Sequence, residues 1–421
     1  MNMKVDARFL VFVSMATVSG FAGAEMMDRP GGIKIGQRMT LRPYVSFGFT
    51  YDSNHDQQNS SKSTTSWTVD PALDLSYRAE NWNLDMNLFY GYRAYNEYAR
   101  ALNSHSYGES LKYVWSDTTK AEKGWTLMLS EQFRRIAEDD SMQVNNGRGL
   151  WRTRQQFDIA GAAQRRITEK FHADASASYS WLDYDNDDEK YAALYGWQRW
   201  VAGLELGYAA SRWTDFLLAG SYQRYYQEND NDISGRNVFY PRSKNYSHES
   251  EGFTLSAGLG SWMTERISYR LLAGWSYFEY GNSESCNGFV YEGSLNWKIT
   301  DTLSTMLLAG SHYQPSETEY GSANRVDSIS WGLAKSLIRG KLSATLDVAY
   351  RKETGEISDA SSWDADEDIF SARFGLSYSL NRFFSIYGNV EYQGCFYGGD
   401  TGGIDRDYNR FRGNVGFRLA Y

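Results

Sequence analysis

The sequence contains few of the residues that cross-link or interrupt a folded chain. Its 421 residues include two cysteines, five prolines and five histidines. Two cysteines cannot form the disulfide framework of a chain this long, so whether Cys286 and Cys395 are bonded stays open. Beyond the N-terminus, no apolar run approaches the roughly 18 residues that a membrane-spanning helix needs. The net charge of −9 argues against nucleic acid as a partner.

The first 24 residues have the features of a secretory signal peptide. Lys4 and Arg8 give a positive start, FLVFVSMATVSGF forms an apolar core, and Ala22, Gly23 and Ala24 offer small residues for cleavage. An uncleaved membrane anchor is the alternative, but the apolar run is short for that role. We therefore expect an exported protein, with a signal peptide over residues 1–24 and a short periplasmic segment over residues 25–37.

The rest of the sequence alternates apolar and polar residues with a period of two. In RFRGNVGFRLAY at the C-terminus, Phe411, Val415, Phe417 and Leu419 alternate with polar, small or cationic residues. Period two marks a β-strand whose two faces meet different surroundings. Eighteen such segments start near residues 40, 65, 82, 106, 125, 150, 171, 197, 214, 251, 266, 287, 302, 326, 341, 368, 383 and 408.

The connections between these segments alternate between short and long. RAEN, KITD, IRGK and SLNR are short, whereas DSNHDQQNSSKSTT and YQENDNDISGRNVFYPRSKNYSH are long and polar. Outer-membrane barrels have short periplasmic turns, longer outer loops, and strands with one lipid-facing and one polar face. Closing the sheet pairs every backbone group inside the membrane. The sequence predicts an all-β fold: a transmembrane antiparallel up-and-down β-barrel of about 18 strands over residues 38–421, in the bacterial outer membrane with both termini periplasmic.

Aromatic residues make up 16% of the chain, and many of them adjoin the predicted connections. Tyr77 and Trp82 flank one short turn, and Trp115 and Trp125 flank another. This placement favours aromatic girdles at the membrane interfaces, although aromatic residues are also good strand formers. Two prolines, at positions 43 and 71, fall inside predicted strands. A closed barrel has no free edge, so we expect them to mark strand ends or bulges.

The last strand has a second interpretation besides being one more lipid-facing strand. Outer-membrane barrels commonly end on an aromatic residue at the membrane interface, and the assembly machinery reads that strand. We expect Phe417, Leu419 and Tyr421 to form this assembly signal, with the barrel-assembly machinery and outer-membrane lipid as partners.

Three segments carry recognisable motifs. The early pattern Y-x-S-x-G-x-x-Y-D-x-N spans Tyr44 to Asn54, LSYR ends a strand at Arg78, and WRTRQQFDIA is an Arg-rich strand. In these motifs the chain resembles outer-membrane β-barrel porin families of Gram-negative bacteria, in particular the type often encoded near exopolysaccharide genes. The resemblance covers most of residues 38–421. It implies an outer-membrane channel or export component, and it carries no catalytic residues.

Charged residues on the predicted inner faces are the candidates for lining the lumen. They either select solutes or pair across strands as a structural ladder, and the two roles are compatible. Eighteen strands are enough to leave an aqueous lumen. The lumen candidates are Arg42, Arg93, Arg134, Arg152, Arg154, Arg373, Arg412, Arg418, Asp70, Asp74 and Asp85.

The sequence therefore favours a non-enzymatic channel for passive passage of small hydrophilic solutes or saccharides. A surface adhesin or scaffold, acting through long outer loops, is the main alternative. A barrel-embedded hydrolase using His172, Asp174, Ser176 and Ser178 is disfavoured, because same-face neighbours on one strand lie near 7 Å apart. We expect no cofactor, metal or nucleic acid. The solute, the oligomeric state and whether a loop closes the lumen stay open.

Overall fold

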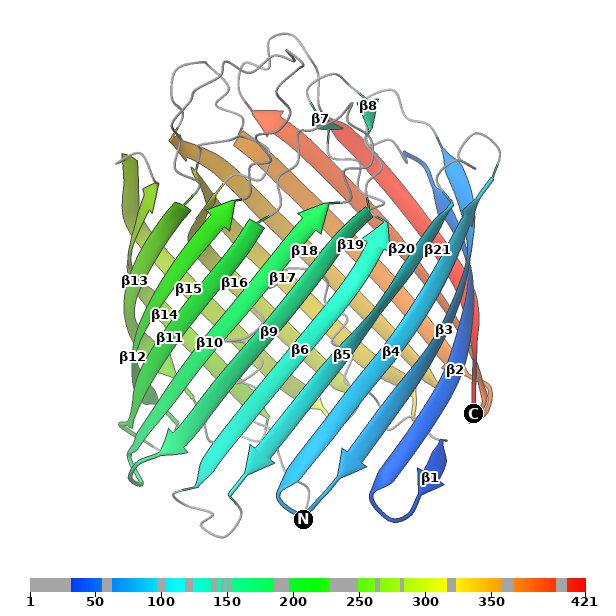
Figure 1. Cartoon of the computed structure of the whole chain (residues 1–421), viewed down its shortest axis with the longest axis horizontal. Helices are drawn as coiled ribbons and strands as arrows, with labels where there is room; N and C mark the ends of the chain where they lie inside the picture. Colours follow the sequence, from blue (N-terminus) through cyan, green and yellow to red (C-terminus); the bar gives the residue numbers. More distant parts are fainter. Residues whose placement is uncertain are drawn as a thin grey trace.

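The chain forms a large closed antiparallel β-sheet in the computed structural model (Figure 1). The structure describes residues 32–54, 63–96, 103–117, 124–137, 143–144, 148–149, 153–184, 197–211, 213–227, 249–261, 266–280, 284–315, 323–357, 366–398 and 407–421. Within these ranges, no helix is long and apolar enough to cross a membrane.

The main sheet has 19 strands, of which the short β1 (Ile33–Ile35) only extends the edge of β2. The other 18 form the wall: β2 (Met39–Asp52), β3 (Thr64–Arg78), β4 (Trp82–Tyr95), β5 (Ser104–Ser116), β6 (Trp125–Ala137), β9 (Thr153–Arg166), β10 (Phe171–Tyr184), β11 (Trp197–Ala209), β12 (Asp215–Gln227), β13 (Glu249–Gly260), β14 (Ile267–Tyr280), β15 (Glu284–Thr300), β16 (Leu303–Pro315), β17 (Ala323–Ile338), β18 (Leu342–Ile357), β19 (Asp366–Ser379), β20 (Phe384–Gly398) and β21 (Tyr408–Ala420). A separate hairpin pairs β7 (Gln143–Val144) with β8 (Arg148–Gly149).

Pairing of the first and last wall strands closes the barrel. The ladder between β2 and β21 runs from Tyr44 opposite Ala420 to Asp52 opposite Arg412. Every other pair of neighbours in the wall is consecutive along the chain and antiparallel. The predicted fold class and strand number are confirmed, and each wall strand starts within three residues of its predicted position.

The two ends of the barrel differ in their connections. Residues 79–81, 167–170, 301–302, 339–341 and 380–383 link strands at one end, which we call the short-turn end. The C-terminus and β1 lie at this end (Figure 1). The opposite end, which we call the loop end, carries the longer links. The predicted alternation has one exception there, because only residues 281–283 join β14 to β15.

The two faces of the wall carry different kinds of side chain, as predicted. Large apolar side chains such as Trp67, Leu129, Trp200 and Trp275 are exposed on the outer face, whereas buried polar groups line the inner face. Aromatic residues stack beside the short turns, as in the contact between Tyr77 and Trp82, whose ring centroids are 4.6 Å apart. This pattern fits a barrel held in lipid, with amphipathic rings at the interface.

Neither proline ends a strand or makes a bulge, so that expectation was wrong. Pro43 lies inside β2, and its carbonyl accepts a hydrogen bond from the Tyr421 backbone N–H at 3.0 Å. The N–H and C=O groups of a strand residue point to the same side, so the missing N–H donor of Pro43 lies on the side that faces Tyr421. Beside Pro71, the β3–β4 ladder skips from Val69 to Ala72 and keeps its register. At neither proline does the missing N–H donor shift the register of the neighbouring strands.

Candidate functional site in the barrel interior

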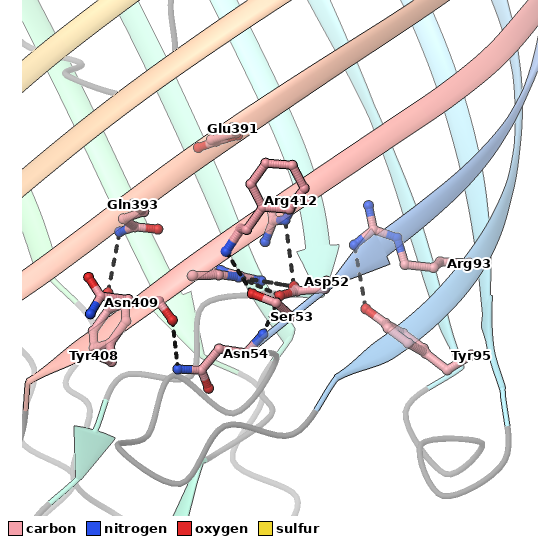
Figure 2. A network of polar contacts seen from close by, with 12 residues as sticks. Asp52, Ser53, Asn54, Arg93, Tyr95, Glu391, Gln393, Tyr408, Asn409 and Arg412 are labelled. Carbon is pink, nitrogen blue, oxygen red and sulfur yellow. Dashed lines mark hydrogen bonds and ion pairs between the residues drawn. The ribbon is translucent and has the colours of Figure 1, made fainter.

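A cluster of buried charges joins the first and last strands at the loop end (Figure 2). We call Asp52, Asn54, Asn409, Arg410 and Arg412 the seam cluster. Nε of Arg410 donates to both carboxylate oxygens of Asp52 at 3.0 and 2.9 Å, and the Arg412 guanidinium lies 3.6 Å from the same carboxylate. Asn54 donates to the Asn409 carbonyl at 3.0 Å. The side chains of Asp52 and Arg410 are 7% and 3% exposed, so this ion pair is a fixed part of the wall.

Two of the predicted lumen arginines, on β2 and β21, contact the inner wall nearer the short-turn end. Arg418 donates to the Ser46 hydroxyl at 3.1 Å and stacks over the Tyr44 ring at 4.8 Å. Arg42 contacts the Ser76 hydroxyl at 3.5 Å. The ring of Tyr387 lies over Gly416, where a Cβ would come within 2.5 Å of the Tyr387 hydroxyl. Because Gly416 has no side chain, the ring of Tyr387 can lie close against β21.

Most of the other predicted lumen charges pair with close neighbours. Arg373 and Glu391 sit directly opposite each other and bond at 2.8 and 3.1 Å. Asp74 accepts from Asn87 at 2.6 Å, and Arg93 lies 3.4 Å from the Tyr95 hydroxyl. Asp85 pairs with Arg78 at 2.6 Å beside a short turn, away from the middle of the lumen. Asp70 lies close to Gly91, where an added Cβ would meet its carboxylate at 2.8 Å.

A polar ladder crosses β6 and β9. Arg134 donates to the Gln156 side-chain carbonyl through Nε and Nη2 at 3.2 and 2.8 Å, and Gln156 donates to Asp158 at 2.8 Å. Arg154 lies within electrostatic range of both Arg134 and Asp158. Arg152 lies outside the described residues. These contacts favour the structural-ladder role for Arg134 and its partners.

The wall departs from a regular barrel between β15 and β16. Their ladder runs from Thr300 only to Glu292, which pairs with Gly310. From that point toward the loop end, β15 pairs with β14 alone, and β16 pairs with β17 alone. Tyr313 of β16 packs on the inner side of β15, in a buried cluster with Phe278, Cys286 and Val290. The loop-end part of β16 is therefore folded inside the neighbouring strand, and we call Ser311 to Pro315 the infolded segment.

The infolded segment contacts β12, four positions away in the wall. Nε2 of Gln223, on β12, donates to the Tyr313 carbonyl at 3.1 Å, and Arg199 donates to Gln223 at 3.0 Å. His312 lies within electrostatic range of Arg199 and Arg351. β18 also approaches β15, although two strands separate them in the sheet. These contacts hold the infolded segment on the inner side of the wall, with Arg199 and Arg351 near His312.

A buried ion network lies nearer the short-turn end. Arg270 of β14 donates to Oε2 of Glu205 through Nε and Nη2 at 2.9 and 2.7 Å, and it also contacts Glu292 of β15. Glu205 is directly opposite Asp174 in the β10–β11 ladder. His172 and Asp174, considered above for a hydrolase, are therefore joined by a carboxylate from the next strand.

Sequence reasoning missed three features of the interior. Asp52 and Arg410 have the inward parity of their strands, so the alternation could have identified them. The infolded segment has no such signal, because Tyr313 has the parity of outward residues. The proximity of Glu205 to His172 depends on strand register, which follows from the fold and not from spacing along the chain.

Comparison with known families supports a porin-like barrel. Residues 235–420 match the model of a family described as "Putative beta-barrel porin 2". The resemblance to β-barrel porins expected from the sequence is confirmed over that part of the chain. No curated protein matches the sequence.

Solved structures with similar folds are distant in sequence. A ferric enterobactin receptor from Pseudomonas aeruginosa is 9% identical, with 93% of this chain and 81% of that chain covered and a TM-score of 0.46. The outer-membrane protein OpdK from the same organism is 10% identical, with 90% and 99% covered and a TM-score of 0.41. OccAB4 from Acinetobacter baumannii is 11% identical, with 91% and 99% covered and a TM-score of 0.41. Similarity at this level does not indicate what this chain binds.

Proposed function

We propose that the protein is an outer-membrane channel for passive passage of small hydrophilic solutes. The observation that carries this proposal is a closed wall of 18 strands whose inner face carries many buried polar and charged groups, beside smaller apolar clusters. Barrels of 16–18 strands enclose an aqueous channel, whereas eight-stranded barrels are filled by side chains. Polar inner faces are stable only beside water or polar partners, since unpaired buried polar groups are costly.

The inner tyrosines favour polar solutes in general over a dedicated saccharide path. Tyr44 contacts Arg418 and Asn87, Tyr95 is buried beside Arg93, and Tyr387 lies over Gly416. These rings are engaged in holding the wall together, so they offer little open face for stacking on sugars. Saccharides remain within the proposed solute class as small hydrophilic molecules.

Single-channel recording on the purified, refolded protein tests the proposal. Stepwise conductance increments are expected in planar bilayers, and a variant lacking residues 228–248 controls for closure by that long connection. Steps in either protein support a channel. Silence in both, with a heat-modifiable gel mobility that proves folding, would overturn the channel and favour the surface adhesin or scaffold.

A further inference from the structure

The inner wall near the short-turn end brings three metal-ligating side chains together. Ligand atoms of His172, Asp174 and Glu205 all lie within 4.8 Å of one another. His172 and Asp174 lie two residues apart on the inner face of β10, and Glu205 is opposite Asp174 on β11. We propose that these three side chains form a binding site for a divalent transition-metal cation of the zinc class. The proposal is independent of whether the lumen conducts solutes.

The two carboxylates of the site attract a cation. Asp174 and Glu205 lie directly opposite each other, and like charges in that position are destabilising. Arg270 divides its single guanidinium between Glu205 and Glu292, so it offsets the charge of Glu205 only in part, and Arg166 lies opposite His172 on β9. Both bonds from Arg270 to Glu205 end on Oε2, so Oε1 is the atom placed to bind a metal. A divalent ion between the carboxylates would neutralise the opposed pair.

Burial and packing hold the histidine in position. His172 and Glu205 are 2% and 3% exposed, which limits the rotamers that either side chain can adopt. Position 207, opposite His172 in the ladder, is a glycine whose missing Cβ would overlap the imidazole ring. The ring therefore lies flat against the backbone of β11, on the same side of the wall as Glu205.

The ligand set selects the class of metal. Imidazole nitrogen suits zinc and other late transition metals, whereas calcium and magnesium prefer oxygen ligands alone. Zinc binds His nitrogen and carboxylate oxygen at about 2.0–2.2 Å, so ligand atoms on one ion lie at most about 4 Å apart. To share one ion, the three ligand atoms must move roughly 1 Å closer together, which small side-chain rotations allow. Sequence spacing alone does not indicate this site, since Glu205 follows Asp174 by a full hairpin.

Zinc binding by the folded barrel in detergent tests the proposal. After chelator treatment, calorimetric titration with Zn²⁺ is expected to show one ion per chain, with binding at least about tenfold weaker in His172→Ala and in Asp174→Asn. Ca²⁺ should not compete at equal concentration. His312→Ala, which removes another histidine from the inner wall, is the matched control and should bind as the unmodified protein does. Heat-modifiable mobility verifies that each variant is folded.

A second measurement covers the case in which His172→Ala does not fold. Co²⁺ bound through imidazole and carboxylate gives visible absorption bands, which should change in His172→Gln and weaken in Asp174→Asn. Absence of stoichiometric Zn²⁺ in the unmodified protein would overturn the proposal. Equal affinity in the unmodified protein, His172→Ala and Asp174→Asn, or unchanged Co²⁺ spectra in His172→Gln, would do the same.

Discussion

At the scale of single residues, buried charges in this wall are tied to specific partners. The pair formed by Asp52 and Arg410 is almost completely buried and is fixed by several short hydrogen bonds. The pair formed by Arg224 and Glu249 has a similar N–O distance of 2.6 Å, but its side chains are 51% and 50% exposed. Solvent screens the exposed pair, so only the buried one should matter for stability.

Replacing Asp52 with Ala should therefore destabilise the folded barrel strongly. The Arg410 guanidinium would stay buried without its main counter-ion, a change that typically costs about 3–5 kcal/mol. Urea unfolding in lipid vesicles, followed by tryptophan fluorescence, measures the loss. Glu249→Gln is the matched control and should leave the free energy of unfolding nearly unchanged, because solvent screens this exposed pair. Equal effects of the two variants would contradict a structural role for the seam cluster.

At the scale of strands, the period-two pattern determines nearly everything that the sequence can predict. It locates all 18 wall strands and their two faces, because the inner and outer surroundings differ along the whole barrel. It does not predict the infolded segment. In the stretch LSTMLLAGSHYQP of β16, Tyr313 has outward parity, yet it packs inside β15 because Gly288 leaves room for it. Such a departure depends on a contact between two strands that no local pattern contains.

Adding a side chain at Gly288 should destabilise the infolded segment. A Cβ there would lie 2.5 Å from the Tyr313 hydroxyl, so Gly288→Val should force Tyr313 away and cost about 1–3 kcal/mol. Gly355→Val is the matched control, since a Cβ at Gly355 meets nothing within 4 Å. Urea unfolding compares the two. A double-mutant cycle with Tyr313→Phe should show coupling between positions 288 and 313, and purely additive effects would argue against the contact.

At the scale of the whole molecule, closure depends on the pairing of β21 with β2. Phe417 of β21 stacks on Phe47 of β2 and Phe384 of β20, with ring centroids 5.0 and 5.8 Å apart. Its side chain lies on the outer face, whereas Asn414 points inward and donates to Thr50 at 2.9 Å. The same strand thus offers an outer aromatic face to lipid and a polar face to the lumen.

Phe417→Asp should reduce the amount of folded protein in the outer membrane more than Asn414→Asp does. The outer substitution removes two ring contacts and places a charge against lipid, which is unfavourable on this face of a barrel. Removal of Tyr421 should act in the same direction if the last residue is part of an assembly signal. The heat-modifiable fraction in membrane extracts measures each effect. Equal losses for the two Asp variants would show that assembly does not depend on this outer face.

Ion selectivity tests where the lumen is narrowest. Arg134 and Arg154, on β6 and β9, are among the lumen candidates from the sequence, whereas the infolded segment lies near Arg199 and Arg351. Charges at a constriction set which ions pass, while charges elsewhere act more weakly through salt screening. Arg199→Ser with Arg351→Ser should therefore shift reversal potentials in a salt gradient toward cations. Arg134→Ser with Arg154→Ser should shift them less, and Arg199→Lys with Arg351→Lys should restore the original preference. A larger shift from the Arg134 and Arg154 pair would place the constriction at β6 and β9 instead.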